Sequence, residues 1–473
     1  MKKRIAIVGG GISGLTAAYI LHRDYAESCE FTLFEAEGRV GGIIETVHVD
    51  GFTIECGPDS WVTEKPWAEQ LARELGLADE LLGSNDHARR TYIARDASLT
   101  PLPEAMRMMV PADLSTVLAS PLFTEAAKQA YIAEPSRAAQ LREHALANRT
   151  ADSDESVAAF VRRHFGDEVV ETVAGPLLAG VFGGDIERLS ARALLGPFVA
   201  MESDYGSLIV GLQQRGRVSE APVFTTLAGG LSMLVTRPME TLLPSACLQL
   251  SSPVLKLDIQ HGGWAVESAN GGERFDRVLL ATPLDTTRRL LARLPCKEAQ
   301  QAAALLPTDA TSGLVVAFGY GTQAKPTPAI PDGFGLLVAA GPQNHHSLLA
   351  CTFLHQKFPG RTPEGSTLLR AFFASSAADE LSRRSDTEIA AIAWNQLTAL
   401  LGPLPEHAEV TIVRRWPRSL PQYEVGHVAR MTQFDLCMSG LQGIAVAGNA
   451  LRGVGLPDLV RDATKAAHLL ARD

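Results

Sequence analysis

The pattern of apolar and polar residues at the start of the chain predicts a β-α-β unit. Residues 4–8 form an apolar, strand-like run that leads into a glycine-rich turn, Gly-Gly-Gly-Ile-Ser-Gly, at 9–14. Residues 15–21 continue with helix-like spacing, and a second strand-like run at 31–34 ends on Glu35. A strand, a glycine turn, a helix and a second strand in this order are typical of a nucleotide-binding fold with a parallel sheet.

The remaining pattern predicts that the cofactor domain is assembled from separated segments. Residues 100–200 are mostly helical in pattern, whereas a strand meander runs from about 253 to 280 and a strand-and-helix block from about 313 to 401. Near the end, a buried strand at 443–447 precedes a closing helix. We therefore expect an α/β (mixed α+β) fold with a Rossmann-type dinucleotide-binding domain in discontinuous segments, a mixed-sheet substrate domain and a helical insertion.

Domain boundaries follow from these changes of pattern. We assign the dinucleotide-binding domain to residues 1–82, 223–290 and 413–473. We assign the substrate domain to residues 83–99, 206–222 and 291–412, and the helical domain to residues 100–205.

The glycine turn suits a dinucleotide. Gly9 permits a tight turn, Gly11 lets the backbone approach a pyrophosphate, and Gly14 lets the helix pack closely on the strand. The phosphates then meet the positive end of the helix. Glu35, at the end of the second strand, can accept hydrogen bonds from ribose hydroxyls.

The residues after the second strand favour FAD over NAD. Arg39 and the glycine pair at 41–42 can bring a cation and bare backbone back to the pyrophosphate. A second candidate for a dinucleotide-binding glycine turn contains Gly319 and Gly321. Prolines that cannot open a helix follow it, so we interpret this segment as a strand end and a loop. A flavin without an obvious nicotinamide site suggests an oxidase or a desaturase.

Composition narrows the class of protein. The 473 residues suffice for two or three domains, and 43 basic against 53 acidic side chains give a net charge of −10, which argues against a general nucleic-acid binder. The six cysteines are scattered without a CxxC pair or a metal-like pairing with histidine, so no metal site is expected.

We predict a cytoplasmic protein or one bound peripherally to the inner face of the cell membrane. The apolar segment 106–123 is interpreted as core, as a membrane face or as a substrate entrance.

Several further motifs carry a family resemblance. They are Gly-Pro-Asp-Ser-Trp at 57–61, Tyr-Ile-Ala-Arg-Asp at 92–96, Gly-Pro-Leu-Leu-Ala-Gly-Val-Phe-Gly-Gly-Asp at 175–185, Arg-Trp-Pro at 415–417, Pro-Gln-Tyr-Glu-Val-Gly-His at 421–427 and Gly-Val-Gly-Leu-Pro-Asp at 453–458. As a set they closely resemble the bacterial oxygen-dependent protoporphyrinogen/coproporphyrinogen oxidases. The resemblance covers nearly the whole chain.

The resemblance implies the reaction and its participants. In that family FAD takes two electrons at a time from a porphyrinogen and molecular oxygen reoxidises it, so three rounds yield the porphyrin of haem synthesis and hydrogen peroxide. The flavin carries the redox chemistry, so no catalytic side chain is assigned. The next enzyme of the pathway is a further possible partner. Protoporphyrinogen IX and coproporphyrinogen III both stay open as the substrate, and so does the oligomeric state.

The resemblance also implies site residues. Those expected to contact FAD are Gly9, Gly10, Gly11, Ile12, Ser13, Gly14, Glu35, Ala36, Arg39, Gly42, Gly57, Pro58, Asp59, Ser60, Val254, Trp416, Val454, Gly455 and Leu456. For the substrate, Gly180 matches a glycine whose backbone approaches the tetrapyrrole. Among Arg89, Arg90 and Arg95, we choose Arg90 to pair with a propionate, because strand alternation places it on the face of Tyr92.

The alternatives are two other kinds of flavoenzyme and one non-catalytic carrier protein. An amine oxidase of the same fold typically has an aromatic residue or a flavin-binding cysteine near the last flavin motif, and residues 447–452 contain neither. A desaturase would share the apolar pocket, and a non-catalytic flavin or tetrapyrrole carrier would lack turnover. We interpret His345, His346 and His355 as loop or core residues and assign no proton chemistry to His427.

Overall fold

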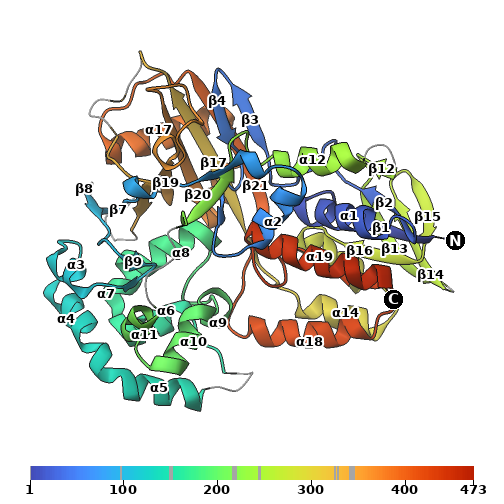
Figure 1. Ribbon diagram of the computed structural model, residues 1–473, viewed down its shortest axis with the longest axis horizontal. Coiled ribbons are helices and arrows are strands. Elements are labelled where there is room, and N and C mark those ends of the chain that lie inside the picture. The colour runs from blue at the N-terminus through green and yellow to red at the C-terminus, as the bar shows by residue number, and fades with distance from the viewer. Residues whose placement is uncertain are drawn as a thin grey trace.

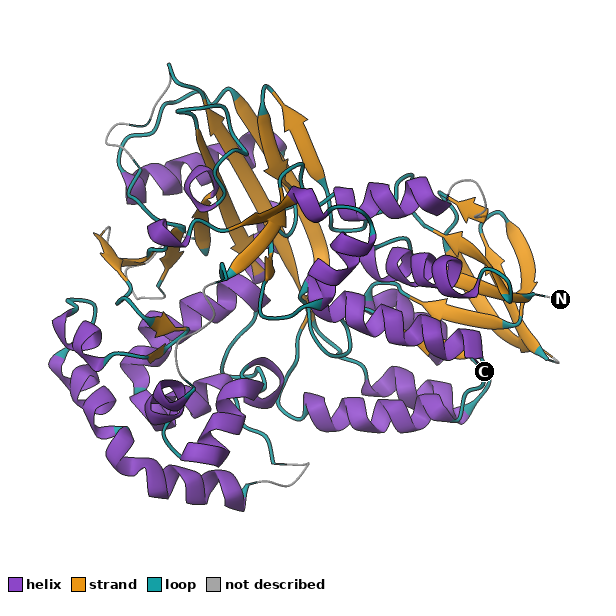
Figure 2. Ribbon diagram, in the orientation of Figure 1, coloured by secondary structure: helices purple, strands orange, loops and turns teal. Residues whose placement is uncertain are grey.

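The computed structural model contains two large sheets, several small ones and a separate group of helices (Figures 1 and 2). It describes residues 2–95, 98–148, 153–215, 221–242, 247–260, 262–323, 326, 330–339 and 347–472. In Figure 1 the parallel sheet lies on the right, the mixed sheet at the upper left and the helical group at the lower left. The expected mixed fold class is confirmed.

The parallel sheet is built from four separate stretches of chain. Its strand order is β12 (Cys247–Gln249), β2 (Cys29–Phe34), β1 (Lys3–Val8), β16 (Arg277–Leu280) and β22 (Ile444–Val446). Every neighbouring pair is parallel. The central strand β1 is buried on both faces, with Ile5, Ala6 and Ile7 fully inaccessible, which explains its continuous apolar run.

Helices cover both faces of this sheet. One face carries α1 (Ile12–Tyr25), α12 (Met233–Leu242) and α19 (Leu456–Arg472), with α2 (Trp67–Glu74) packed outside them. The other carries α13 (Leu284–Ala292), α14 (Lys297–Leu305), α18 (His427–Ser439) and the meander of β13 (Val254–Gln260), β14 (Gly263–Ser268) and β15 (Gly271–Phe275). The boundaries between domains stay a prediction.

Short strands connect the half of the molecule that contains the parallel sheet with the half that contains the mixed sheet. They are the hairpin of β3 (Thr46–Val49) and β4 (Phe52–Glu55), and the small sheet of β5 (Trp61–Val62), β11 (Phe224–Leu227) and β6 (Leu81–Gly83). The hairpin packs with the mixed sheet, since Phe52 and Ile54 share a buried cluster with Ala317 and Leu368.

The mixed sheet has seven strands. Their order is β21 (Val410–Pro421), β17 (Ala310–Tyr320), β20 (Thr367–Ala374), β19 (Ala350–Phe353), β18 (Gly335–Val338), β7 (Thr91–Arg95) and β8 (Ser98–Pro101), and the β18–β7 pair alone is parallel. Helices α15 (Leu354–Lys357), α16 (Ser375–Leu381) and α17 (Asp386–Leu401) follow its strands. Apolar residues of α17 cover one sheet face.

The helical group forms its own core. It contains β9 (Met106–Arg107), β10 (Val110–Pro111), α3 (Leu114–Ala119), α4 (Glu125–Ala133), α5 (Ala138–Ala147), α6 (Val157–Phe165), α7 (Asp167–Val169), α8 (Gly175–Phe182), α9 (Ala191–Leu194), α10 (Gly196–Tyr205) and α11 (Leu208–Gln214). Met109, Val110, Val117, Leu122 and Phe123 of the apolar segment are buried in this core, as the core interpretation expects. Among the residues that the structure describes, none of the helices is long and apolar enough to cross a membrane.

A buried polar network links α4, α6 and α10 inside the helical group. His164 Nδ1 lies 2.9 Å from Glu134 Oε1 and its Nε2 lies 3.2 Å from Glu202 Oε1. Arg163 also pairs with Glu202. Burial alone would raise the pKa of Glu202, but the hydrogen bonds from His164 and Arg163 outweigh it and lower that pKa. The network therefore fixes three helices that the apolar pattern alone does not orient.

Candidate flavin and substrate site

The glycine turn between β1 and α1 leaves its backbone open. A Cβ on Gly9, whose φ is +107°, would lie 2.4 Å from the Ala281 carbonyl oxygen, and one on Gly14 would lie 1.9 Å from the Gly9 carbonyl oxygen. Gly11 has nothing within 4 Å of its Cβ position and caps α1 without a side-chain hydrogen bond. The backbone N–H groups at a helix N-terminus are a suitable anion site for a pyrophosphate.

Glu35 and Arg39 shape the same turn. The Glu35 carboxylate accepts hydrogen bonds from the backbone N–H of Gly10 (2.6 Å) and of Glu37 (2.9 Å), and each oxygen keeps a further lone pair. Arg39 Nη2 donates to the Gly42 carbonyl at 2.8 Å. Arg39 therefore braces the glycine pair 41–42, which lies beside Gly11 through a parallel bridge between Gly11 and Gly41.

Two more predicted segments border this turn. A Cβ on Gly57 would lie 1.9 Å from the Ile43 carbonyl oxygen, so this glycine permits the close approach of the 57–60 segment to the 41–44 turn. Trp416 Nε1 donates to the Cys56 carbonyl at 2.7 Å, which brings β21 to the same segment. Next to Glu35, the Ser252 N–H donates to the Glu35 carbonyl at 2.8 Å and places Val254 beside β2.

The loop before α19 is held by a stacked pair. The Tyr423 and His427 rings lie 4.0 Å apart at 12°. The Tyr423 hydroxyl donates to the Asn449 carbonyl at 2.5 Å and accepts from the Gly453 N–H at 3.0 Å. His427 Nε2 lies 2.6 Å from the Leu451 carbonyl oxygen. These contacts fix the loop that leads to Val454, Gly455 and Leu456, at the N-terminus of α19.

The mixed sheet presents a partly open face to α8. Phe372, Ala350, Leu337 and Ile93 pair in register across β20, β19, β18 and β7, and the first three are only half-buried although they lie in inner strands. Their strand neighbours Ala371, Cys351 and Leu336 point into the core under α17 instead. The row therefore faces α8, and Leu337 packs against the core of the helical group.

The two predicted substrate residues lie on different faces of this sheet. A Cβ on Gly180 of α8 would lie 3.5 Å from Leu337 Cδ2, so Gly180 is on the open side. Tyr92 packs with the core on the α17 side, and alternation puts Arg90 there too. Arg95 is two residues after Ile93 in β7, so it lies on the same strand face as Ile93, on the side of Gly180. The roles of Arg90 and Gly180 stay predictions.

Sequence reasoning missed the partners of Asp59. Its carboxylate lies 3.1 Å from Lys357 Nζ and 3.0 Å from Arg370 Nη1, both from the mixed-sheet half of the molecule. A second missed pair joins Arg361 to Glu55, and both of these side chains are fully buried. The available signal was Arg370 itself, a lone charge in the apolar strand Thr367–Ala374. Lys65, which pairs with Asp458 in the first turn of α19, was also missed.

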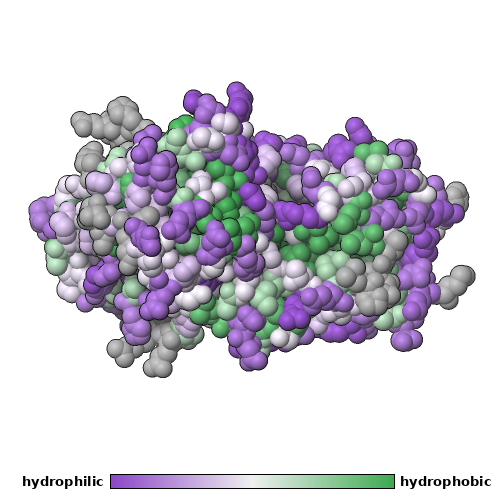
Figure 3. Space-filling model, turned by 90° about the horizontal axis from the view of Figure 1, so that it is seen from above, coloured by the Kyte–Doolittle hydropathy of each residue, from purple (hydrophilic) through white to green (hydrophobic). Residues whose placement is uncertain are grey.

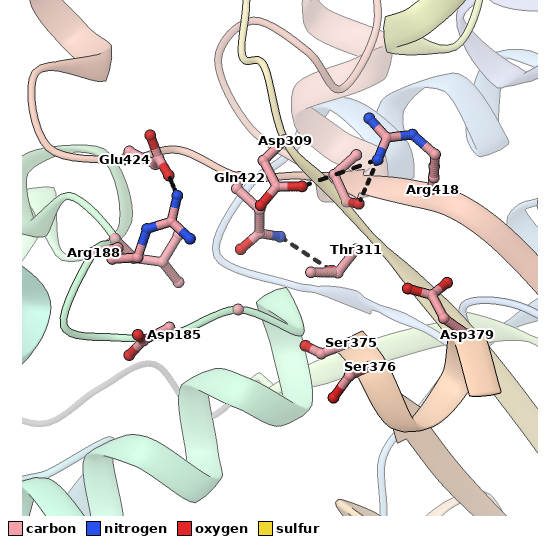
Figure 4. A pocket seen from close by; sticks show the side chains of 13 residues that line it. Asp185, Arg188, Asp309, Thr311, Ser375, Ser376, Asp379, Arg418, Gln422 and Glu424 are labelled. Carbon is pink, nitrogen blue, oxygen red and sulfur yellow. Dashed lines mark hydrogen bonds and ion pairs between the residues drawn. The ribbon is translucent and has the colours of Figure 1, made fainter. Parts of the chain in front are cut away.

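A polar cavity of about 330 Å³ lies beyond the C-terminal end of α8 (Figure 4). In it Arg188 pairs with Glu424, Arg418 faces Asp309 at 4.0 Å, and Gln422 donates to Thr311. Its acidic and basic side chains do not suit an apolar macrocycle, so we do not place the substrate there. The part of the chain that the structure describes holds no cluster of histidine, cysteine and acidic residues fit for a metal.

The histidines behave as structural residues where they are described. His355 is half-buried beside Leu368, and burial lowers its pKa. His345 and His346 lie outside the described residues, as does Asp96 of the 92–96 motif.

The parallel sheet with its open glycine turn and the adjoining mixed sheet define a flavin-binding oxidoreductase. A model of the flavin-containing amine oxidoreductases matches residues 12–471, and the chain belongs to this family. The prediction of a flavoenzyme with FAD as cofactor is confirmed.

Its relatives are more specific. The chain is 32% identical to the coproporphyrinogen III oxidase of Bacillus subtilis, over 98% of this chain and 97% of that protein. It is 28% identical to the mitochondrial protoporphyrinogen oxidase of Nicotiana tabacum, over 99% and 94%. The crystal structure of an Exiguobacterium protein assigned as a protoporphyrinogen oxidase superposes with a TM-score of 0.83 at 32% identity, over 100% and 99% of the chains. These relatives confirm the resemblance noted in the motifs.

The two glycines of the turn should respond differently to alanine. Gly11→Ala places a methyl group in open space, so we expect little loss of stability and at least about tenfold weaker FAD binding. Gly14→Ala places it 1.9 Å from the Gly9 carbonyl oxygen and should destabilise the apoprotein itself. Thermal unfolding of the apoprotein and fluorescence titration with FAD separate the two effects. Equal loss of stability in both variants would contradict this assignment of the turn.

His427 should make stability depend on pH. Burial lowers its pKa to about 4, so between the ordinary histidine value near 6.5 and about 4 the unfolded chain binds more protons than the folded chain. The folded state therefore loses up to about 1.4 kcal/mol per pH unit from this group as the pH falls through that window. His427→Phe, which keeps an aromatic ring beside Tyr423, should flatten the fall of the unfolding midpoint. The exposed His407→Gln is the control, and an unaltered pH profile in His427→Phe would refute the role.

Proposed function

We propose that the protein catalyses the oxygen-dependent oxidation of a porphyrinogen to the porphyrin, a step of haem biosynthesis. The observation that carries the proposal is the half-buried row Phe372, Ala350 and Leu337, an apolar part of the mixed-sheet face toward α8. Figure 3 shows apolar residues gathered in the middle of the upper face, between the two halves of the molecule. Full-length similarity to porphyrinogen oxidases supports the same conclusion.

The chain's contribution is binding and orientation. Bound FAD would supply the two-electron redox chemistry of each of three rounds, with oxygen as the final electron acceptor and hydrogen peroxide as its product. The residues at Gly11, Gly42 and the 57–60 segment would hold FAD, and the N-terminus of α19 would favour negative charge on it. The half-buried sheet face would orient the macrocycle and exclude water. No nucleophile or metal is required for this reaction.

We propose coproporphyrinogen III as the preferred substrate. Two bacterial relatives named coproporphyrinogen III oxidases, from Bacillus subtilis and Mycobacterium bovis, are 32% identical to the chain, and the mitochondrial protoporphyrinogen oxidase is 28% identical, although the Exiguobacterium structure assigned as a protoporphyrinogen oxidase also has 32% identity. A substrate with four propionates needs more cations at the rim of its pocket than one with two. Arg89 and Arg95 are exposed near β7, on the face opposite to Arg90 by strand alternation, and can supply such charge. Peripheral membrane contact and transfer of product to the next pathway enzyme are further proposals.

A side-by-side assay tests the function. The FAD-loaded protein is given coproporphyrinogen III or protoporphyrinogen IX, and porphyrin fluorescence and peroxide are followed with and without oxygen. We expect oxygen-dependent turnover with the larger kcat/KM for coproporphyrinogen III. A larger value for protoporphyrinogen IX would reverse the substrate choice. No turnover of either compound by protein that holds FAD would refute the function and favour an amine oxidase.

Arginine variants test how the carboxylates are bound. Because Arg95 shares the open face with Gly180, Arg95→Ala should raise KM by about tenfold with little change in kcat, as loss of one charge-assisted hydrogen bond predicts. Arg90→Ala, on the opposite face, should change KM by less than about threefold. Steady-state kinetics with both porphyrinogens gives the comparison. The reverse order of effects would restore Arg90 as the propionate partner.

A further inference from the structure

Asp59 is flanked by two buried cations. Lys357 Nζ lies 3.1 Å from Asp59 Oδ1 and 3.3 Å from Oδ2, and Arg370 Nη1 lies 3.0 Å from Oδ2. Lys357 is 8% exposed and Arg370 is fully buried. One carboxylate therefore faces two positive charges, and the three side chains together carry an excess of one positive charge.

The other contacts of these cations do not neutralise the excess. Lys357 Nζ donates to Ser60 Oγ at 3.2 Å and lies over the rings of Phe224 and Phe358. Arg370 Nη2 donates to the Gly57 carbonyl. Within the described ranges, Asp59 is the one carboxylate paired with either cation.

Arg370 also keeps unused donors. Its Nε and Nη1 make no hydrogen bond to any residue that the structure describes, although Nη1 is close to Asp59. The neighbouring buried pair, Arg361 and Glu55, is balanced one to one. The imbalance is therefore local to the segment that precedes β5.

Asp59 itself is ionised in this environment. Burial alone would raise the pKa of Asp59, but the charges of Lys357 and Arg370 and a hydrogen bond from Ser60 outweigh it and hold that pKa well below the usual range. The carboxylate thus already contributes its full negative charge at neutral pH, and the cationic excess persists.

We propose that Lys357 and Arg370 are positioning residues for bound FAD. Through Asp59 and the Gly57 carbonyl they fix the 57–60 segment, and their uncompensated positive charge stabilises reduced FAD relative to oxidised FAD. The inference rests on the proposed placement of FAD against this segment. A fixed charge in a dry site acts strongly on a neighbouring redox group, because little solvent screens it.

The test measures FAD affinity and midpoint potential in the FAD-loaded protein. Lys357→Met removes the charge and keeps the length of the side chain, so FAD should bind about tenfold more weakly and its potential should become more negative. A further tenfold loss of affinity for reduced FAD alone corresponds to about 30 mV for a two-electron couple. Asp59→Asn removes the negative charge and should move the potential in the opposite, positive direction.

Other variants separate charge from structure. Arg370→Lys keeps the charge but loses the reach of the guanidinium, so it should weaken FAD binding and keep the potential. Lys357→Arg should also keep the potential, and the exposed Lys297→Met is the control for loss of a lysine. Potentials that move in the same direction in Lys357→Met and Asp59→Asn would overturn the electrostatic effect. Affinity and potential unchanged in Lys357→Met would overturn the whole inference.

These measurements need no porphyrinogen. Reduction of bound FAD is followed by absorbance during titration with dithionite against a reference dye. A protein that binds FAD but oxidises neither porphyrinogen would refute the proposed function and leave this test unaffected, so the two failures are distinguishable.

Discussion

The architecture depends on buried ion pairs that join the mixed-sheet half to the short strands and the 57–60 segment between the two large sheets. Arg361, from the mixed-sheet half, pairs with Glu55 at the end of β4, and both side chains are fully buried. Glu55 also accepts hydrogen bonds from the Leu231 N–H and the Thr46 hydroxyl. Removing one partner of such a pair would leave an uncompensated buried charge, which is strongly destabilising. The two halves therefore cannot shift against each other without breaking these contacts.

This constraint sets the geometry of the site. The segment that follows Glu55 is the one whose glycine packs on the 41–44 turn, so the junction fixes it against both the dinucleotide turn and the mixed sheet. The Tyr423–His427 pair does the same for the loop before α19. A ligand between these segments meets walls whose relative positions are already fixed, which limits the reorganisation that binding requires.

The local parts of this arrangement could be predicted from sequence, and the long-range parts could not. The β1–α1–β2 unit follows from nearby glycines and apolar spacing, and so does the closing helix after residue 456. By contrast, Lys357 lies 298 residues from Asp59, and no periodicity connects the two positions. Strand alternation groups Arg90 with Tyr92 on one face of β7. It does not say which face of β7 lies toward α8, because that depends on the helices packed against the sheet.

A shared fold does not imply a shared reaction in this family. Putrescine oxidase shares the fold with a TM-score of 0.66 at 19% identity, a likeness that concerns the backbone alone. Within a shared fold, the side chains that line the site determine the substrate. Here the mixed-sheet face toward α8 carries Phe372, Ala350 and Leu337 in one apolar row, and the guanidinium of Arg370 lies over the Phe372 ring, 5.0 Å from its centroid. Such a row suits a large, flat, apolar substrate whose charges lie at its periphery, because only the rim then needs cations.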